Sequence, residues 1–288
     1  MRMMSEQSLP RAHEGERVRV GPFSMSDTSF AIESNEHAMA AELDSRLRDL
    51  RVDHADGWPT VFTVDRNGPP WASHPWGVWR DGGACETSLA PAAVLPFLLW
   101  EITRLLIENV ATDVPVHGSA VTLDGKSVLL VGGGVRAARL AAALVASGWG
   151  YQSHDVTVLR NGDDQVLVRP FWRPIEVHRG EGLDHVLGTS EESTTLPVST
   201  LGTLAPPTPL AVVVLATFSR GHAHDTQPLS PAETLAGMCE ELPLRGAQGR
   251  RSFTALAPVA ESVPGYSLRF DDVAEAEGRL RDLMRSLP

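Results

Sequence analysis

Three residues near the middle of the sequence have side chains suited to acid–base catalysis: His117, His154 and Asp155. A histidine titrates near neutral pH, and a carboxylate partner can orient its ring, so such a pair can take a proton from a substrate and return it. The alternative is that both histidines are structural and satisfy backbone groups. We predict that His117, or the His154–Asp155 pair, is catalytic.

A glycine run and two arginines indicate a place for an anion. The run ends at Gly134, and Arg136 and Arg139 follow it at the start of an apolar segment. Free backbone amides at the start of a helix bind anionic groups such as an enolate or a carboxylate. The residues expected to bind this group are Gly133, Gly134, Arg136 and Arg139. Because arginines in a first helical turn oppose the helix dipole, the alternative is that both are solvated at the surface.

Tryptophans are numerous for a chain of this length, with 7 among 288 residues. Trp76 and Trp79 lie in a segment that also contains proline and glycine, and Trp172 lies between Phe171 and Arg173. We predict that Trp76, Trp79 and Trp172 form an aromatic wall for a large apolar ligand. The alternative is that they are core residues, as most buried tryptophans are.

The elements that must position these residues begin with a strand, a glycine turn and a helix. Val128–Val131 is an apolar strand, Gly132–Gly134 is the turn, and a helix is expected from Arg136 to Ser147. This order is typical of a phosphate-binding loop, which also needs a lysine and a hydroxyl directly after its last glycine. Neither follows here, and Lys126, before the strand, is the only lysine in the sequence. We therefore expect no nucleotide chemistry and no cofactor.

The remaining pattern alternates strands and helices, so the sequence predicts a mixed α/β fold. The expected strands are Val114–Leu123, Ser127–Val131, His154–Arg160, Gln165–Arg169 and Leu210–Phe218. The expected helices are Pro91–Asn109, Pro231–Glu241 and Asp272–Leu287. Ser190–Pro209, rich in Ser, Thr and Pro, is expected to be a loop at the edge of a substrate site.

Several motifs occur in the order found in a known family. They are His117-Gly-Ser-Ala-Val121, Gly125, Val128-Leu-Leu-Val-Gly132, Gly148, His154-Asp155-Val-Thr-Val158, Arg169-Pro-Phe-Trp-Arg-Pro174 and Val263-Pro-Gly-Tyr-Ser-Leu268. From Val114 to Leu287 the chain resembles the C-terminal domain of HPr kinase/phosphorylase, whose fold is related to phosphoenolpyruvate carboxykinase. It looks most like the HPr-kinase-like proteins of bacterial peptide and polyketide natural-product gene clusters.

The resemblance implies that the phosphoryl-transfer residues have been replaced. It aligns Ala137 with the family's lysine and Ala138 with its magnesium-binding hydroxyl. Of the family's two acidic residues after the next strand, the first is His154 here and only Asp155 remains, whereas His117 matches the family's strand histidine. If the family fold holds, His117, His154 and Asp155 lie at neighbouring strand ends.

Composition limits the classes of partner and the compartment. The formal net charge of −11 and the lack of basic runs exclude a typical nucleic-acid binder and a membrane-surface role. The apolar stretches are too short to span a bilayer, and the polar N-terminus does not resemble a signal peptide. The 2 cysteines suit a reducing cytoplasm, so we expect a cytoplasmic protein. His222 and His224 have a metal-like spacing, but an exposed loop is the preferred interpretation and no metal is expected.

The predicted organisation is a disordered N-terminus (1–17), a smaller β/α region (18–110) and an HPr-kinase-like core (111–288). The preferred hypothesis is an ATP-independent enzyme of specialised-metabolite biosynthesis that dehydrates, isomerises or cyclises a polyketide-like molecule. Its expected substrate is a small, largely apolar molecule with an anionic group, and self-association is left open. The alternatives are a non-catalytic pseudokinase that binds a peptide or protein, and a residual kinase.

Overall fold

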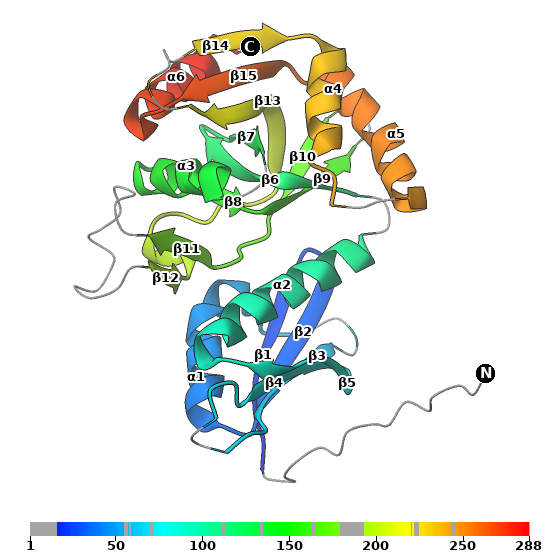
Figure 1. Cartoon of the computed structure of the whole chain (residues 1–288). Coiled ribbons are helices and arrows are strands. Elements are labelled where there is room, and N and C mark those ends of the chain that lie inside the picture. Colours follow the sequence, from blue (N-terminus) through cyan, green and yellow to red (C-terminus); the bar gives the residue numbers. More distant parts are fainter. Residues whose placement is uncertain are drawn as a thin grey trace. The chain divides into compact units, whose positions relative to one another are not determined.

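The computed structural model divides the chain into two units, coloured along the sequence in Figure 1. The described residues are 16–54, 57, 59–69, 72–110, 113–132, 135–162, 165–178, 193–219, 221, 225–243 and 246–287. Unit 1 comprises Met1–Ser24, Thr28–Ser45 and Arg51–Ile102, and unit 2 comprises Met25–Asp27, Arg46–Leu50 and Thr103–Pro288. Most of the N-terminus that we expected to be disordered, up to residue 15, lies outside the described residues.

Unit 1 is built on a five-stranded sheet with the order β1-β2-β3-β4-β5. The strands are β1 (Val18–Met25), β2 (Thr28–Ser34), β3 (Thr60–Arg66), β4 (Trp76–Arg80) and β5 (Gly83–Leu89). Most of helix α1 (His37–Arg46) and of helix α2 (Pro91–Asn109) lies in this unit, whereas the 3-10 turn η1 (Arg48–Leu50) lies in unit 2. The rings of Phe23, Phe30 and Phe62 pack against one another, which gives this unit an aromatic core.

Unit 2 holds an eight-stranded sheet with the order β10-β9-β6-β7-β13-β15-β14, in which β8 pairs with β6. Its strands are β6 (Val114–Leu123), β7 (Lys126–Val131), β8 (Gly150–Ser153), β9 (Val156–Asn161), β10 (Val166–Arg169), β13 (Thr208–Phe218), β14 (Asp225–Leu229) and β15 (Gly265–Phe270). Strands β7, β13 and β15 are parallel neighbours. Because β10 pairs with β13 as well as β9, the strands β10, β9, β6, β7 and β13 form a closed ring.

Four α-helices, a second 3-10 turn and a small hairpin lie wholly in unit 2 among the described residues. They are α3 (Val135–Ala146), the 3-10 turn η3 (Val198–Thr200), α4 (Pro231–Glu240), α5 (Gly246–Ser262), α6 (Val273–Ser286) and the pair β11 (Ile175–His178) with β12 (Ser193–Leu196). Helix α4 begins with a capping box, in which the Ser230 hydroxyl accepts from the Glu233 amide.

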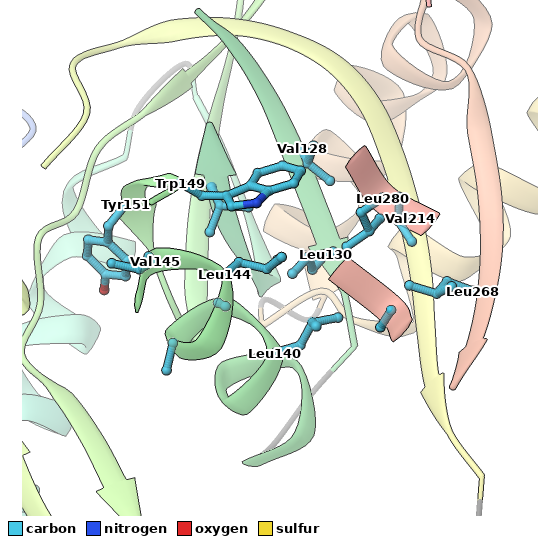
Figure 2. Close-up of a cluster of buried hydrophobic side chains, with 14 of the residues drawn as sticks. Val128, Leu130, Leu140, Leu144, Val145, Trp149, Tyr151, Val214, Leu268 and Leu280 are labelled. Carbon is cyan, nitrogen blue, oxygen red and sulfur yellow. The ribbon is translucent and has the colours of Figure 1, made fainter. Parts of the chain in front are cut away.

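Strand β7 is buried on both faces, which explains why its sequence is continuously apolar. Val128 and Leu130 face a cluster that includes Leu140 and Leu144 of α3, as Figure 2 shows. Leu129 and Val131 belong to a second cluster with residues of α4 and α5. Complete burial of one such aliphatic side chain contributes about 1.5–3 kcal/mol, so these two clusters fix β7 and α3 firmly.

The mixed α/β class expected from the sequence is confirmed. The predicted helix Pro91–Asn109 and strand Val114–Leu123 have the predicted bounds, and β7, α3, β13, α4 and α6 differ by one or two residues at their ends. The predicted strand His154–Arg160 is wrong at its start, because β9 begins at Val156. The described part of the predicted loop Ser190–Pro209 contains β12 and η3, so an entirely irregular loop is wrong as well.

Candidate functional site

His117 lies on β6 at the carboxyl end of the parallel strands. The last pair between β6 and β7 joins Gly118 to Val131, so one further step of the ladder places His117 opposite Gly132. On its other side, His117 pairs with Val156, the first residue of β9. Ligands of α/β sheets usually bind where parallel strands end, and His117 therefore occupies the part of the sheet where a ligand is expected.

The His117 ring has one defined hydrogen-bond partner, the backbone oxygen of Asp155. His117 Nδ1 is 3.0 Å from this oxygen. Because a carbonyl oxygen only accepts, Nδ1 must carry a proton, and in the neutral ring Nε2 then keeps its lone pair. The same Asp155 oxygen accepts a second hydrogen bond of 3.1 Å from the Gly118 amide. The half-buried His117 thus has a defined tautomer.

Asp155 is the central residue of a tight backbone turn. The Val156 amide donates to the His154 oxygen at 2.8 Å, a bond that spans two residues, and Asp155 between them has φ 69°. This geometry is that of a γ-turn with positive φ, which is rare and strained. Strain of this kind costs roughly 1–3 kcal/mol and persists only where the surroundings hold the residue in place.

The Asp155 carboxylate forms an ion pair with Arg173. The carboxylate is 43% exposed, whereas the Arg173 side chain is only 14% exposed. Burial acts to raise the pKa of Asp155, but the positive charge of Arg173 outweighs it and holds this pKa below its ordinary value. Asp155 is therefore anionic at neutral pH and faces a fixed cation.

His154 lies in a buried chain of hydrogen bonds. Its side chain is next to the hydroxyl of Tyr151, with Nδ1 at 2.9 Å, and that hydroxyl donates to the Arg173 backbone oxygen at 3.0 Å. The Tyr151 proton is thereby used, so His154 Nδ1 must be the donor to Tyr151. Burial and the nearby Arg173 lower the pKa of His154 to about 3, and burial raises the pKa of Tyr151. At neutral pH, His154 is an uncharged donor.

The segment that carries Arg173 is fastened along β8. The Phe171 amide donates to the Gln152 oxygen at 2.8 Å, and the Arg173 amide donates to the Phe171 oxygen at 2.7 Å. The Trp172 indole donates to the Ala205 oxygen at 3.2 Å and packs against the hydrophobic cluster of α3. The structure thus places Trp172, one of the predicted substrate-binding tryptophans, against the core beside this site.

The structure brings together some of the predicted site residues and leaves others untested. Gly133, Gly134 and the side chain of Arg136 lie outside the described residues, and Arg139 is exposed on α3. The two other predicted tryptophans lie on β4 in unit 1, where Trp76 is buried and Trp79 partly buried. Their predicted role in binding a ligand stays a prediction.

The described residues contain neither a cluster suited to a metal ion nor a helix suited to a membrane. No group of His, Cys, Asp or Glu in that part of the chain is arranged to hold a metal ion. His222 and His224 lie outside the described residues. Across the same residues, no helix is long and apolar enough to cross a membrane.

Sequence reasoning missed two residues of this cluster, Tyr151 and Arg173. Tyr151 is one of only 2 tyrosines and lies three residues before His154. Arg173 lies in the Phe-Trp-Arg-Pro segment that the sequence analysis singled out only as a family motif. Tyr151 bonds to the nearby His154, but Arg173 reaches Asp155 and Tyr151 from 18 and 22 residues away in the sequence, and no local pattern encodes those two contacts.

Comparison with known proteins gives a distant structural likeness. No protein-family model matches the sequence, and no curated protein matches it either. Among solved structures, the chain is similar to the "Hpr(Ser) kinase/phosphatase from Coxiella burnetii", with 12% sequence identity and a TM-score of 0.34. The match covers 59% of this chain and 95% of that chain. A likeness of this size leaves the chain's function to be argued from its own residues.

Proposed function

We propose that this chain is an ATP-independent enzyme that transfers protons on an organic substrate, with His117 as the proton carrier. The observation that carries the proposal is the hydrogen bond from His117 Nδ1 to the Asp155 backbone oxygen. It directs the ring and leaves Nε2 as the basic atom, which is the arrangement that a general base requires. The reaction classes that fit are dehydration, isomerisation and ring closure.

The two histidines have different roles in this proposal. His154 has a pKa of about 3 because it is buried, and so it does not accept a proton at neutral pH. His117 is only half-buried and its Nε2 has no assigned partner among the described residues. We therefore assign proton transfer to His117 and a supporting role to His154 and Asp155.

The position of the single lysine supports the absence of ATP chemistry. Lys126 is the first residue of β7, whereas the glycine turn follows the last residue of this 6-residue strand. Strand residues rise about 3.3 Å each, so roughly 20 Å of strand separates Lys126 from the turn. No other lysine exists in the chain. A phosphate group at the turn would have no lysine to bind it.

The proposed substrate class follows from the glycine turn and from the family resemblance. Helix α3 has 12 residues and begins at Val135, directly after the turn, so its first amides are available to an anionic group. We propose a polyketide-like intermediate of specialised metabolism whose carboxylate or enolate is held there, with Arg136 and Arg139 as candidate contacts.

The experiment compares His117→Gln with a gene deletion and with His54→Gln in the source strain. His54 is an exposed histidine of unit 1 and is the matched control. We expect metabolite profiling to show the same accumulated precursor in His117→Gln as in the deletion, and normal products in His54→Gln. Normal products from His117→Gln would overturn the catalytic role and favour a binding module. Equal melting temperatures of the purified proteins exclude loss of folding.

A further inference from the structure

The strained turn at Asp155 is held from two directions by one residue, Arg173. The Arg173 guanidinium binds the Asp155 carboxylate directly. The Arg173 backbone oxygen accepts from Tyr151, which in turn accepts from His154, the residue before Asp155. These contacts form a closed circuit around the peptide that joins His154 and Asp155.

This circuit fixes the position of the Asp155 backbone oxygen, and that oxygen orients the His117 ring. With φ at 69°, the Asp155 oxygen reaches both His117 Nδ1 and the Gly118 amide. An aspartate released from its side-chain contact would favour negative φ, because L-residues with a Cβ avoid the positive region. The oxygen would then leave His117, and no other hydrogen bond of this ring among the described residues would select one tautomer.

We infer that Arg173, Tyr151 and His154 are positioning residues that set the tautomer of His117 through the Asp155 backbone oxygen. The carboxylate of Asp155 acts here as the attachment point for Arg173, and the backbone oxygen acts on the catalytic ring. The consequence for catalysis rests on the proposed function of His117, whereas the tautomer can be measured without any substrate.

The hydrogen bonds that hold residues 171–173 in place support this inference. The Phe171 amide donates to a backbone oxygen of β8, and the Trp172 indole donates to the Ala205 oxygen. Arg173 therefore belongs to a segment that is held at two points. Tyr151 is fully buried, and Figure 2 shows it at the margin of the hydrophobic cluster with its hydroxyl directed away from Trp149. A rigid support of this kind is needed to hold a strained turn.

The test is nitrogen-15 NMR of the histidine rings in the full-length protein, at a pH at which the His117 ring is neutral. Chemical shifts of Nδ1 and Nε2 distinguish the two tautomers, and the His117→Gln spectrum identifies the His117 signals. We expect Nδ1–H to predominate in the wild type, although histidine in water favours Nε2–H. In Tyr151→Phe and Arg173→Gln the ratio of Nδ1–H to Nε2–H should fall about tenfold, the equivalent of about 1.4 kcal/mol.

The controls separate positioning from general loss of structure. Tyr266→Phe changes the other tyrosine and should leave the His117 signals unchanged. Arg173→Lys keeps a cation for Asp155 and should restore part of the Nδ1–H preference. If Arg173→Gln does not fold, the test rests on Tyr151→Phe, which removes a single oxygen atom.

Two outcomes would overturn the inference: an unchanged Nδ1–H form in Tyr151→Phe, or a wild type in which Nε2 carries the proton. The first would leave the proposed catalysis by His117 intact. Conversely, normal metabolites from His117→Gln would refute the catalytic role of His117 but would not affect the inference about its tautomer. The two proposals therefore fail in different experiments.

Discussion

At the scale of single residues, burial decides the chemistry of His154. Its side chain is 7% exposed and is used as a neutral donor to Tyr151. Burial and the neighbouring Arg173 both oppose a positive charge on His154, which places its pKa at about 3. The unfolded chain has no such constraint, and there the imidazole has its ordinary pKa of about 6.5.

This difference predicts an acid-sensitive fold. Between about pH 6.5 and pH 3 the unfolded state binds the His154 proton and the folded state does not, so stability falls as pH falls through this window. One such group contributes a slope of at most about 1.4 kcal/mol per pH unit. Urea unfolding at pH 7, 6 and 5 should show a steeper loss in the wild type than in His154→Gln.

His54→Gln provides the control for this pH series, because His54 is exposed. It should lose stability with acid as steeply as the wild type. Parallel curves for the wild type and His154→Gln would contradict a buried, neutral His154.

At the scale of elements, the close pairing of β6 with β7 depends on Gly118. A Cβ at this position would lie 2.6 Å from the Leu130 backbone oxygen, closer than real Cβ contacts allow. The Gly118 oxygen also accepts from the Thr157 hydroxyl at 3.1 Å, which ties β6 to β9 beside His117. Glycine is therefore required at this position by the distance between two backbones.

The same substitution at two glycines should have opposite effects. Gly118→Ala forces β6 away from β7 and should destabilise the fold by about 1–3 kcal/mol. Gly278→Ala, at an exposed position within α6 where an added Cβ meets nothing within 4 Å, should stabilise it by up to about 1 kcal/mol. Urea unfolding followed by tryptophan fluorescence measures both. Equal effects would show that β6 and β7 separate without cost.

At the scale of the whole molecule, a strand and a helix flank a glycine run, as in a phosphate loop, but the lysine of such a loop is missing. Strand β7 is followed in the chain by α3, with the glycine run Gly132–Gly134 between them in the sequence, and two hydrophobic clusters hold β7 in place. Packing therefore maintains this order of elements without the lysine that a phosphate loop requires.

We predict that Mg-ATP leaves the melting temperature of the protein unchanged at millimolar concentration. A ligand present at 100 times its Kd adds about 2.7 kcal/mol to the stability of the folded state, which a thermal-shift titration detects readily. A saturable rise in melting temperature, absent with magnesium alone, would contradict ATP-independence and revive the residual-kinase hypothesis.

The sequence by itself determined the α/β class, the bounds of several elements and the identity of candidate residues. The continuous apolar run of β7 and the helical spacing of α3 are local patterns, and the structure has both elements close to their predicted bounds. His117, His154 and Asp155 were named from residue type and motif order. The structure places His117 within hydrogen-bonding distance of Asp155.

Only the tertiary structure decided which role each of these residues has. It showed that His154 is buried and bonded to Tyr151, that Arg173 reaches Asp155, and that β9 starts after a strained turn. The contact of Arg173 with Asp155 joins residues 18 apart in the sequence, and the burial of His154 depends on the packing around it, although Tyr151 is only three residues away. A pattern of residues can indicate that a histidine is present near a strand end, but the burial that sets its charge and the partner that sets its tautomer come from the rest of the fold.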